Sequence, residues 1–348
     1  MKNKFISIIL PIRNEEKYIE KTLNSIFNQT YPIKLYEVII SDGMSNDNTY
    51  KIITKFSKHY KNIKIIKNPF KIVPHGLNLS LNESKGDVIV RIDGHTIIDK
   101  FYLENCVKLL YEKKAHNVGG LINPIKHNGK SSLIGIATSS KFGIGNSPFH
   151  YSLKGNWVDT VYLGAWDRKV FQEIGGFDEE LKRNQDDEFN FRMIQNKFKI
   201  WLDPSIKSSY HSRNSFLKLF KQYFQYGFYK VRVFQKRRGF TSYRHLIPAI
   251  FILSLFSSAF IYFYNKQIIL FLAILCSYLL MSFGFSIYNL VKEKKINILI
   301  LPFIYFILHS SYGLGTISGL IFFINKWNNY ELKDSLFNKK KFLVNDRK

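Results

Sequence analysis

The sequence has few cysteines, and one long stretch of it lacks acidic residues. Cys106 and Cys276 are the only two cysteines in 348 residues. This excludes a disulfide framework and is typical of a reducing compartment. Residues 204–292 contain no Asp or Glu, whereas ten Lys or Arg lie in residues 207–244. The formal net charge of +25 favours nucleic acid, an anionic membrane surface or a polyanionic substrate as a partner.

Charge is also absent from three long apolar runs, residues 246–264, 268–291 and 296–324. Each exceeds or approaches the roughly 20 residues that cross a hydrocarbon core. They predict a transmembrane region over residues 245–325; three helices of a large soluble core are the alternative. The basic residues directly precede the first run, as the positive-inside rule and anionic lipids favour. We therefore expect the basic residues of this segment to bind anionic membrane lipids and no nucleic acid.

The segments on either side of the apolar region are basic. Residues 211–244 are amphipathic, basic and aromatic, which predicts a helix in the membrane interface, with an ordinary packed helix as the alternative. Three crossings would put the tail, residues 326–348, outside the cell, but its excess of Lys and Arg favours the cytoplasm. The third run contains Gly313, Gly315 and Gly319. A re-entrant pair of half-helices would return the tail inside, and the sequence leaves both topologies open.

The first 210 residues alternate between strand-like and helix-like segments. Strands are expected at residues 5–10, 36–40, 63–66 and 87–93, and helices at 15–29, 48–60 and 75–83. The first apolar run is too short for a signal peptide, which needs about 7–15 such residues. The alternation predicts βαβ units and a mainly parallel sheet, with ligands at the carboxyl ends of the strands. Asp42 and Asp93 lie at such ends, although Asp-Gly is also an ordinary turn pair.

Two motifs at the N-terminus carry a family resemblance. SIILPIRNEEKYIEKTLNSIFNQTY and EVIISDGMSNDNT resemble the start of family 2 glycosyltransferases, which have a GT-A-type α/β fold. The resemblance implies a cytoplasmic nucleotide-sugar-binding domain over residues 1–210. It also implies that uracil and ribose are held by a loop and a strand end, here Pro11, Arg13, Glu15, Asp42, Gly43 and Ser45.

The stretch DVIVRIDGH lies where that family has its metal-binding DxD motif. The resemblance implies that Asp93 binds the nucleotide diphosphate through a divalent cation, Mn²⁺ or Mg²⁺. A cation held there neutralises the charge that develops on the leaving group. His95 replaces the usual second Asp, and imidazole suits manganese better than magnesium. His95 is expected to bind the metal; direct contact with a diphosphate oxygen is the alternative.

Residues 163–193 resemble the acceptor-side segment of the same family. An inverting transfer needs a general base for the acceptor hydroxyl. The family's base maps to Asp186, with Asp187 as the possible alternative base. The alternative without a catalytic role is a solvated acidic helix N-terminus, which the helix dipole favours. The resemblance also implies a donor and acceptor pocket shaped by Trp166, Gly175, Gly176, Phe177, Asp178, Gln185 and Arg192.

The order of RIDGH, GNSPF, GGFDEEL, NQDDEFNFR and KQYFQYG is most similar to bacterial succinoglycan-type glycosyltransferases. It implies an inverting, metal-dependent enzyme that moves a sugar from a nucleotide donor, expected to be UDP-linked, onto a lipid-linked glycan. The process would be exopolysaccharide or cell-surface polysaccharide biosynthesis at a bacterial cell membrane. A polyprenyl-phosphate glycosyltransferase and a non-enzymatic membrane component that only binds nucleotide are the alternatives.

Overall fold

The computed structural model describes residues 4–125, 130–145, 148–150, 152–210, 215–239, 243–293 and 299–344. The chain divides into two packing units. Unit 1 comprises Met1–Asn123, Pro148–His211 and Glu331–Lys348, and unit 2 comprises Pro124–Ser147 and Ser212–Tyr330. The sequence predicted a domain over residues 1–210, an interfacial segment over 211–244, a transmembrane region over 245–325 and a tail over 326–348. In the packing units, Pro124–Ser147 groups with the apolar helices and Glu331–Lys348 groups with the sheet.

Unit 1 is built on a nine-stranded sheet in the order β3-β2-β1-β4-β8-β6-β9-β5, with β7 paired to β9. The four strands predicted from the sequence are parallel and adjacent: β1 (Ile6–Ile12), β2 (Tyr36–Asp42), β3 (Ile63–Lys67) and β4 (Val88–Arg91). The remaining strands are β5 (Thr96–Ile98), β6 (Asn117–Pro124), β7 (Asn156–Val158), β8 (Tyr162–Asp167) and β9 (Ile200–Tyr210). Beyond β4 the described pairings are antiparallel.

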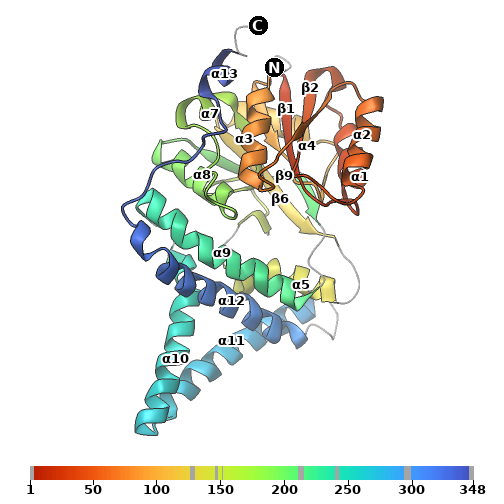
Figure 1. The fold of residues 1–348 in the computed structure, drawn as a ribbon. Helices are drawn as coiled ribbons and strands as arrows, with labels where there is room; N and C mark the ends of the chain where they lie inside the picture. Colours follow the sequence, from red (N-terminus) through yellow and green to blue (C-terminus); the bar gives the residue numbers. More distant parts are fainter. Residues whose placement is uncertain are drawn as a thin grey trace. The chain divides into compact units, whose positions relative to one another are not determined.

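Helices cover both faces of this sheet, as its apolar strands require. Along β1, Ile6, Ile8 and Leu10 point into one core and Ile9 into the other, because successive side chains alternate between faces. The first core includes α1 (Ile19–Phe27), α2 (Thr49–His59) and α4 (Tyr102–Glu112). The second includes α3 (Val73–Glu83), α7 (Arg168–Ile174) and α8 (Gln185–Gln195). Figure 1 shows α3 and α1 beside the strands.

Unit 2 is helical. It contains α5 (Lys130–Thr138), α6 (Lys141–Ile144), α9 (Phe216–Arg237), α10 (Ile247–Asn265), α11 (Ile269–Glu293) and α12 (Leu301–Phe322). The last three are long and apolar enough to cross a membrane, as the sequence predicted. α12 runs unbroken through all of its glycines, so the alternative of two half-helices is not what the structure has. Short 3₁₀ helices are η1 (Ile33–Leu35), η2 (Pro148–His150), η3 (Tyr243–His245) and η5 (Ile324–Lys326).

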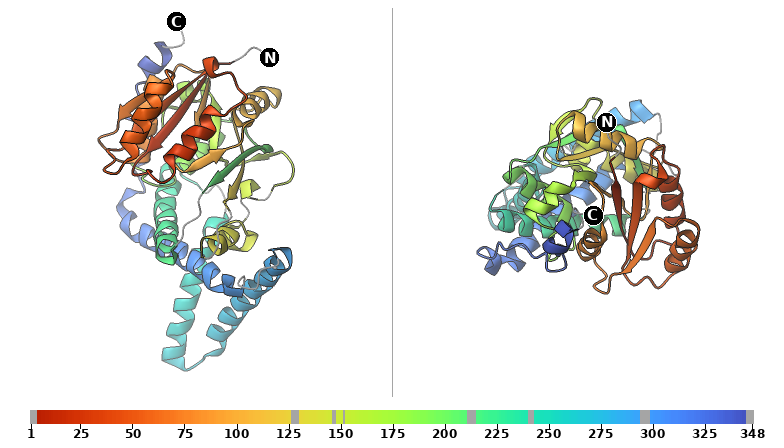
Figure 2. Two further views of the ribbon diagram at one scale, coloured as in Figure 1. Left: turned by 90° about the vertical axis from the view of Figure 1, so that its right-hand side faces the viewer. Right: turned by 90° about the horizontal axis from the view of Figure 1, so that it is seen from above.

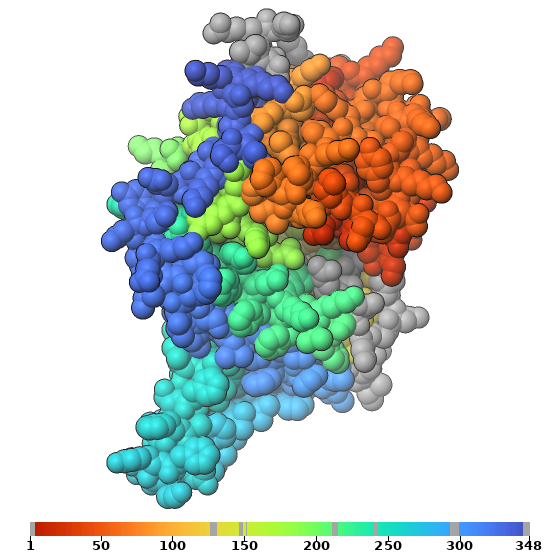
Figure 3. Space-filling model, in the orientation of Figure 1, coloured from red at the N-terminus to blue at the C-terminus, as the bar shows by residue number. Residues whose placement is uncertain are grey.

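The chain returns to unit 1 after η5. We call residues 331–344, which end in α13 (Lys339–Val344), the C-terminal strap. Phe337 and Phe342 of the strap are buried in the second core of unit 1. The Arg168 guanidinium lies 3.6 Å from the centre of the Phe342 ring. Figures 1 and 3 show this dark-blue segment running over α7 and α3. The sequence predicted a basic tail over residues 326–348, but it did not predict that this tail packs on unit 1.

Candidate active site

Two loops at the carboxyl edge of the sheet carry the predicted nucleoside contacts. Ile12 at the end of β1 pairs with Asp42 at the end of β2. The Asp42 side chain is nearly buried and accepts a hydrogen bond of 2.6 Å from the Ser45 hydroxyl. The Gly43 amide donates to the Ile12 carbonyl at 2.8 Å. A Cβ at Gly43 would lie 3.1 Å from the Cβ of Arg13, so a side chain there would crowd the neighbouring loop.

The same two loops are bonded to each other. The Asn14 amide donates to the Ser45 hydroxyl at 2.9 Å, and the Glu15 amide donates to Thr49 Oγ1 at 2.7 Å. Asn14 has a φ of 56°, in the left-handed region that Asn tolerates better than most residues. Pro11 is buried and Arg13 is exposed, so only the second presents its side chain to solvent. Bonds between residues 31 and 34 positions apart thus hold the two loops together.

A buried arginine lies beside the predicted metal ligand. Arg91, the last residue of β4, donates two hydrogen bonds to the Asp93 carboxylate, from Nε at 2.9 Å and from Nη2 at 3.3 Å. Burial raises the pKa of Asp93, but the charges of Arg91 and His95 lower it further, so its pKa lies below the ordinary value. Asp93 is therefore an anion at neutral pH. The Nη1 of Arg91 is buried with no hydrogen-bond partner among the described residues.

The predicted base faces the same arginine. Asp186 lies in the first turn of α8 with Asp187 and Glu188, where the helix dipole favours negative charge. Burial raises the pKa of Asp186 above its ordinary value, and the neighbouring charge of Asp187 adds to this effect. The charge of Arg91 partly opposes it. The guanidinium of Arg91 interacts electrostatically with both Asp93 and Asp186, which brings the two predicted acidic centres into one site.

His95 is held by a carboxylate from the first loop. Its Nδ1 lies 3.0 Å from Glu15 Oε1, and the two side chains are 34% and 20% exposed. A carboxylate at one imidazole nitrogen orients the ring, so Nε2 is the nitrogen that would bind a metal. Glu15 was predicted to contact the nucleoside, and in the structure its carboxylate contacts His95. The packing at Gly94 is tight, since a Cβ there would lie 2.9 Å from Ile12 and 3.0 Å from Glu15.

The donor set fits a metal shared with a substrate. The described residues contain no group of three His, Cys, Asp or Glu side chains placed to enclose a cation. Asp93 and His95 offer one anionic oxygen ligand and one imidazole. Divalent cations in nucleotide sites are bound by one or two protein carboxylates together with substrate phosphates. These residues therefore suit a cation that is completed by a diphosphate, rather than one held by protein alone.

Several predicted pocket residues lie in the interior. Trp166 and Phe177 are buried at 1% and 0% exposure, and Trp166 packs edge-on against Phe177. Arg192 is also buried, where it bonds Glu188 and donates to the Gly176 carbonyl at 2.6 Å. Asp178 and Gln185 are buried too. These side chains are packed in the interior around α8. That they shape a donor and acceptor pocket stays a prediction.

The two glycines of the GGFDEE turn have a different neighbour from the expected sugar. Gly175 has a φ of 84°, and a Cβ there would lie 2.6 Å from the Asp334 carboxylate of the strap. A Cβ at Gly176 would lie 2.4 Å from Asn78 Oδ1 and 2.8 Å from Phe337. The Gly176 amide donates to Asp334 at 3.1 Å. The space at these glycines is filled by the strap and α3.

Glu179 completes the attachment of the turn to the strap. Its carboxylate accepts hydrogen bonds from Asn78 Nδ2, the Ser335 hydroxyl and the Leu336 amide at 2.8, 2.7 and 2.8 Å. The sequence pointed to none of these partners, and it did not single out Arg91. A charged residue inside an otherwise apolar strand, DVIVRID, was the available signal for Arg91. For Asn78, Glu179 and Asp334 there was no comparable signal, because they meet only in the folded chain.

Comparison with known proteins places this site in a family. The family model for glycosyl transferase family 2 matches residues 7–174. The chain is also 32% identical over 325 residues to the Methanococcus voltae dolichyl N-acetyl-alpha-D-glucosaminyl phosphate 3-beta-D-2,3-diacetamido-2,3-dideoxy-beta-D-glucuronosyltransferase. That match covers 91% of this chain and 97% of the relative. The chain belongs to glycosyltransferase family 2.

Two further similarities extend this result. The succinoglycan biosynthesis protein ExoA of Rhizobium meliloti is 26% identical over 243 residues, covering 69% of this chain and 73% of that protein. The mannosyltransferase PcManGT from Pyrobaculum calidifontis, solved with GDP-Man and Mn²⁺, superposes with a TM-score of 0.62 at 15% identity. It covers 91% of this chain and 87% of that chain, and it shows the shared fold. The predicted family, GT-A-type fold class and glycosyltransferase activity are thus confirmed.

Proposed function

We propose that this family 2 glycosyltransferase transfers a sugar, with inversion, from a UDP-linked donor to a hydroxyl group of a lipid-linked glycan. The name of the Methanococcus voltae relative, which contains a dolichyl N-acetyl-alpha-D-glucosaminyl phosphate and a 3-beta linkage, supports a lipid-linked sugar as acceptor. The similarity to a succinoglycan biosynthesis protein supports a role in surface polysaccharide assembly. The proposed process is the synthesis of an exopolysaccharide or another cell-surface glycan.

One observation carries the proposal: two carboxylates whose pKa values are shifted in opposite directions interact with one buried arginine. Asp93 is held as an anion by Arg91, whereas the pKa of Asp186 is raised by burial. Carboxylates whose environments separate their pKa values in this way commonly take different roles in one reaction. We assign Asp93 to the donor diphosphate and Asp186 to the acceptor hydroxyl, with Asp187 as the possible alternative base. A raised pKa makes Asp186 a stronger proton acceptor.

In the proposed reaction, Asp186 takes the proton of the acceptor hydroxyl while the oxygen attacks the anomeric carbon. The bond between that carbon and the diphosphate oxygen breaks, and the nucleoside diphosphate leaves. Arg91 keeps a positive charge beside both carboxylates and so limits the repulsion between Asp186 and the donor. A divalent cation bound by Asp93 and His95 would act as a Lewis acid on the diphosphate. Glu15 orients His95 for this contact.

The donor nucleoside is assigned to the two bonded loops at the ends of β1 and β2. Asp42 is placed to accept from a ribose hydroxyl or a base N–H, and Pro11, Arg13 and Gly43 form the neighbouring surface. The bonding of Asp42 to Ser45 fixes the carboxylate before any ligand arrives. Preorganised donors and acceptors lose less entropy on binding. This supports a nucleotide site that is formed in the absence of substrate.

We place unit 1 on the cytoplasmic side of the cell membrane, with anionic lipids near α9. The segment from Phe216 to Arg237 contains six Lys or Arg and no acid, and it directly precedes the apolar helices. Basic segments next to membrane spans favour the cytoplasm. Anionic lipids, rather than nucleic acid, are the proposed partner of this basic segment. A nucleotide donor made in the cytoplasm would then reach the site directly.

A donor screen tests the proposed function. Membranes containing the protein are incubated with UDP-, GDP- and dTDP-sugars and a lipid-linked glycan acceptor, with Mn²⁺, with Mg²⁺ and with chelator. We expect transfer from a UDP-sugar that requires a divalent cation and produces a β-linkage from an α-linked donor. Transfer only from a GDP- or dTDP-sugar would refute the assigned nucleotide, and undiminished transfer with chelator would refute the metal.

The acceptor type is tested separately. A lipid phosphate acceptor is already ionised and needs a base far less than a hydroxyl does. We therefore expect the double variant Asp186→Asn/Asp187→Asn to lose transfer to glycan acceptors, and the wild-type protein to leave a bare polyprenyl phosphate unglycosylated. Transfer to polyprenyl phosphate that survives in the double variant would identify the protein as a polyprenyl-phosphate glycosyltransferase instead.

A further inference from the structure

The number of membrane crossings follows from where the chain leaves and re-enters unit 1. The chain leaves unit 1 at Ser212 and belongs to it again from Glu331 onward. A compact folded unit lies on one side of a bilayer, so residues 212–330 cross it an even number of times. That segment contains three helices long and apolar enough to cross. At least one of them therefore stays on the side of unit 1, a conclusion that rests on the proposed membrane location.

The strap holds the C-terminus in unit 1 by several independent contacts. Phe342 is fully buried, and its carbonyl accepts from Arg168 Nη2 at 2.5 Å. Asn82 Nδ2 donates to the Leu336 carbonyl, and the Asn338 amide donates to Asn82 Oδ1 at 2.8 Å. Lys341 pairs with Glu83. A C-terminus on the opposite side of a membrane would have to give up all of these contacts.

Among the three candidates, α12 is the one packed into protein. Half of its most apolar stretch is buried, against 17% for α10 and 11% for α11. Its buried face carries small and polar residues, including Ser311, Gly315 and Gly319. Near the start of α12, Tyr305 donates to Ser140 at 3.1 Å, beside the short helix α6. α5 and α6 are 9 and 4 residues long, too short to cross a membrane.

α12 is also bound along its length to a charged helix. Gly227 of α9 meets the Tyr312 backbone, Gly315 meets Phe224, and Gly319 meets Phe228, each at 2.1–2.6 Å from the Cβ position of the glycine. The two helices therefore run parallel in close backbone contact, as small residues allow. α9 contains six Lys or Arg, which makes it unsuitable for the hydrocarbon core.

The ends of these two helices are joined as well. Arg232 of α9 is fully buried and donates to the Lys326 carbonyl and to Asn329 Oδ1, both at 3.2 Å. Gln235 donates to the Phe323 carbonyl at 2.8 Å. These bonds join the C-terminal part of α9 to the backbone that directly follows α12. From Tyr312 onward, α12 therefore lies at the same depth relative to the bilayer as α9. It cannot cross the bilayer while α9 remains at the membrane surface.

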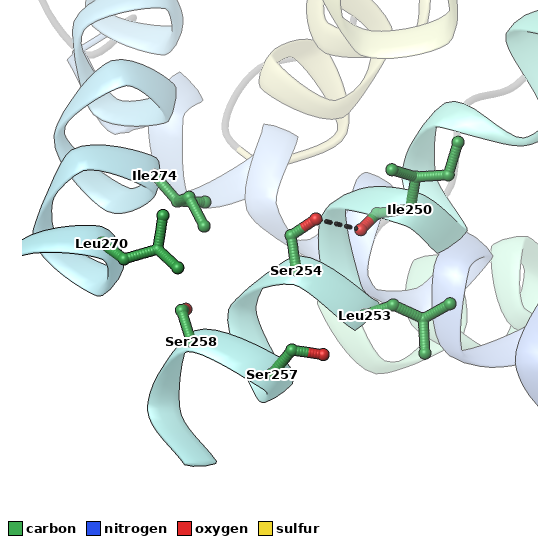
Figure 4. A pocket seen from close by; sticks show the side chains of 7 residues that line it. All are labelled: Ile250, Leu253, Ser254, Ser257, Ser258, Leu270 and Ile274. Atoms are coloured by element: carbon green, nitrogen blue, oxygen red, sulfur yellow. Dashed lines mark hydrogen bonds between the residues drawn. The ribbon is translucent and has the colours of Figure 1, made fainter. Parts of the chain in front are cut away.

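The helices α10 and α11 have the opposite properties. They are joined by residues 266–268 and meet as an open hairpin in Figures 1 and 2. Most of their surface is exposed and apolar. Figure 4 shows Ser254, Ser257 and Ser258 of α10 around a hollow of about 370 Å³ that Leu270 and Ile274 of α11 also line. Ser254 and Ser258 donate to carbonyls of their own helix, which satisfies them in hydrocarbon.

We propose that the α10–α11 hairpin alone crosses the membrane and that α12 stays on the side of unit 1, packed along α9. The bilayer then contacts two spanning helices, and Lys266 at the turn of the hairpin is exposed on the opposite side. Lys and Arg flank both other ends of the hairpin: Arg244 lies before α10, Lys292 lies in the last turn of α11, and Lys294 and Lys295 follow it in sequence. This distribution agrees with the positive-inside rule for two crossings.

Cysteine labelling tests the topology without any assay of activity. Cys106→Ala and Cys276→Ala give a background without cysteines. Single cysteines are then introduced at exposed positions, as Lys266→Cys or Gln267→Cys at the hairpin turn and Lys339→Cys or Lys340→Cys in the strap. A membrane-impermeant maleimide is applied to intact cells and to permeabilised cells, and labelling is quantified on full-length protein.

We expect the hairpin turn to be labelled in intact cells, and positions 339 and 340 only after permeabilisation. Labelling of these last positions in intact cells would overturn the proposal in favour of three crossings. Protection of both turn positions in intact cells would overturn it in favour of no crossing. The use of two positions in each region guards against loss of a single variant. Since no outcome depends on transfer, the result stands whether or not the proposed acceptor and donor are correct.

Discussion

The two halves of the candidate site are held in place by different parts of the chain. On the nucleotide side, the loops after β1 and β2 are bonded to each other by residues within about 35 positions in sequence, such as Asn14 and Ser45. On the acceptor side, the GGFDEE turn is attached to the C-terminal strap, with Gly176 bonded to Asp334 across 158 positions. The nucleotide half is thus a local structure, whereas the acceptor half depends on the last residues of the chain.

The acceptor half can therefore be completed only late in synthesis of the chain. The strap follows the last apolar helix, so it can dock on unit 1 only after that helix has been made. Arg192 then connects the turn to α8, because it donates to Gly176 and pairs with Glu188 on the helix that carries Asp186.

The largest effect is expected at Arg91, which faces both halves. Arg91→Met leaves Asp93 without its partner and removes the charge that lowers the pKa of Asp186. We expect kcat/KM to fall by about 10²–10⁴-fold. Because Asp186 acts as a base only when ionised, and its pKa rises further in this variant, the acid limb of the pH profile of kcat/KM should move to higher pH. The control Arg13→Met should raise the KM for donor and leave the acid limb in place.

The next effect is expected at the strap. Phe342→Ala removes a fully buried ring from the second core and from the face of Arg168. We expect a loss of about 3–5 kcal/mol in the free energy of unfolding of unit 1, typical of such truncations. Leu343→Ala is the matched control, because the neighbouring side chain is 41% exposed and should change stability by less than about 0.5 kcal/mol. Denaturant unfolding in detergent measures both; equal values would contradict the docking of the strap.

A smaller effect is expected where the strap meets the turn. Glu179→Gln places an amide among three donors that now share its carboxylate, so at least one bond is lost. We expect about 1–3 kcal/mol of destabilisation. We also expect a lower kcat with an unchanged donor Kd, because the turn supports α8 and not the nucleotide loops. Glu173→Gln, at an exposed position of α7, is the control. An increase in donor Kd with unchanged kcat would contradict the division into two halves.

The smallest effect is expected in the nucleotide loops. Ser45→Ala removes the hydroxyl that bonds Asp42 and Asn14, a change of about 1 kcal/mol. We expect the KM for donor to rise several-fold, the kcat to stay unchanged, and the stability of the strap contacts to be unaffected. Ser57→Ala, whose hydroxyl bonds only within α2, is the control and should leave the KM for donor unaltered. A fall in kcat with constant KM would place Ser45 in the acceptor half.

The sequence predicted the parallel half of the sheet because each strand there is followed by a helix with clear periodicity. β1 to β4 and α1 to α3 agree with the expected segments, and Asp42 and Asp93 lie at strand ends as predicted. The antiparallel half was not predicted, since strands such as β5 and β7 are three residues long and lack alternation. Contacts between residues more than 150 positions apart, such as those of Glu179 with Ser335, have no local signature in sequence.

The roles of individual acidic residues were predicted from position, and their environments came from the fold. Asp186 and Asp187 are adjacent in sequence and indistinguishable by residue type. In the structure the Asp187 amide donates to Asp186 Oδ1 at 3.0 Å, and Asp186 interacts with Arg91. Similarly, Trp166 and Phe177 were placed at the pocket because they lie in the motif, yet they pack into the core. A motif identifies a segment more reliably than it identifies which side chains of that segment face the ligand.

The most direct test compares Asp186→Asn with Asp187→Asn. Transfer from the donor identified in the screen is measured by product formation, and donor binding is measured by calorimetry on the same preparations. If Asp186 is the base, its variant loses about 10²–10⁴-fold in kcat with the donor Kd nearly unchanged, whereas the Asp187 variant keeps most of its activity. Unchanged turnover in Asp186→Asn, or a loss confined to Asp187→Asn, would contradict the assignment of Asp186.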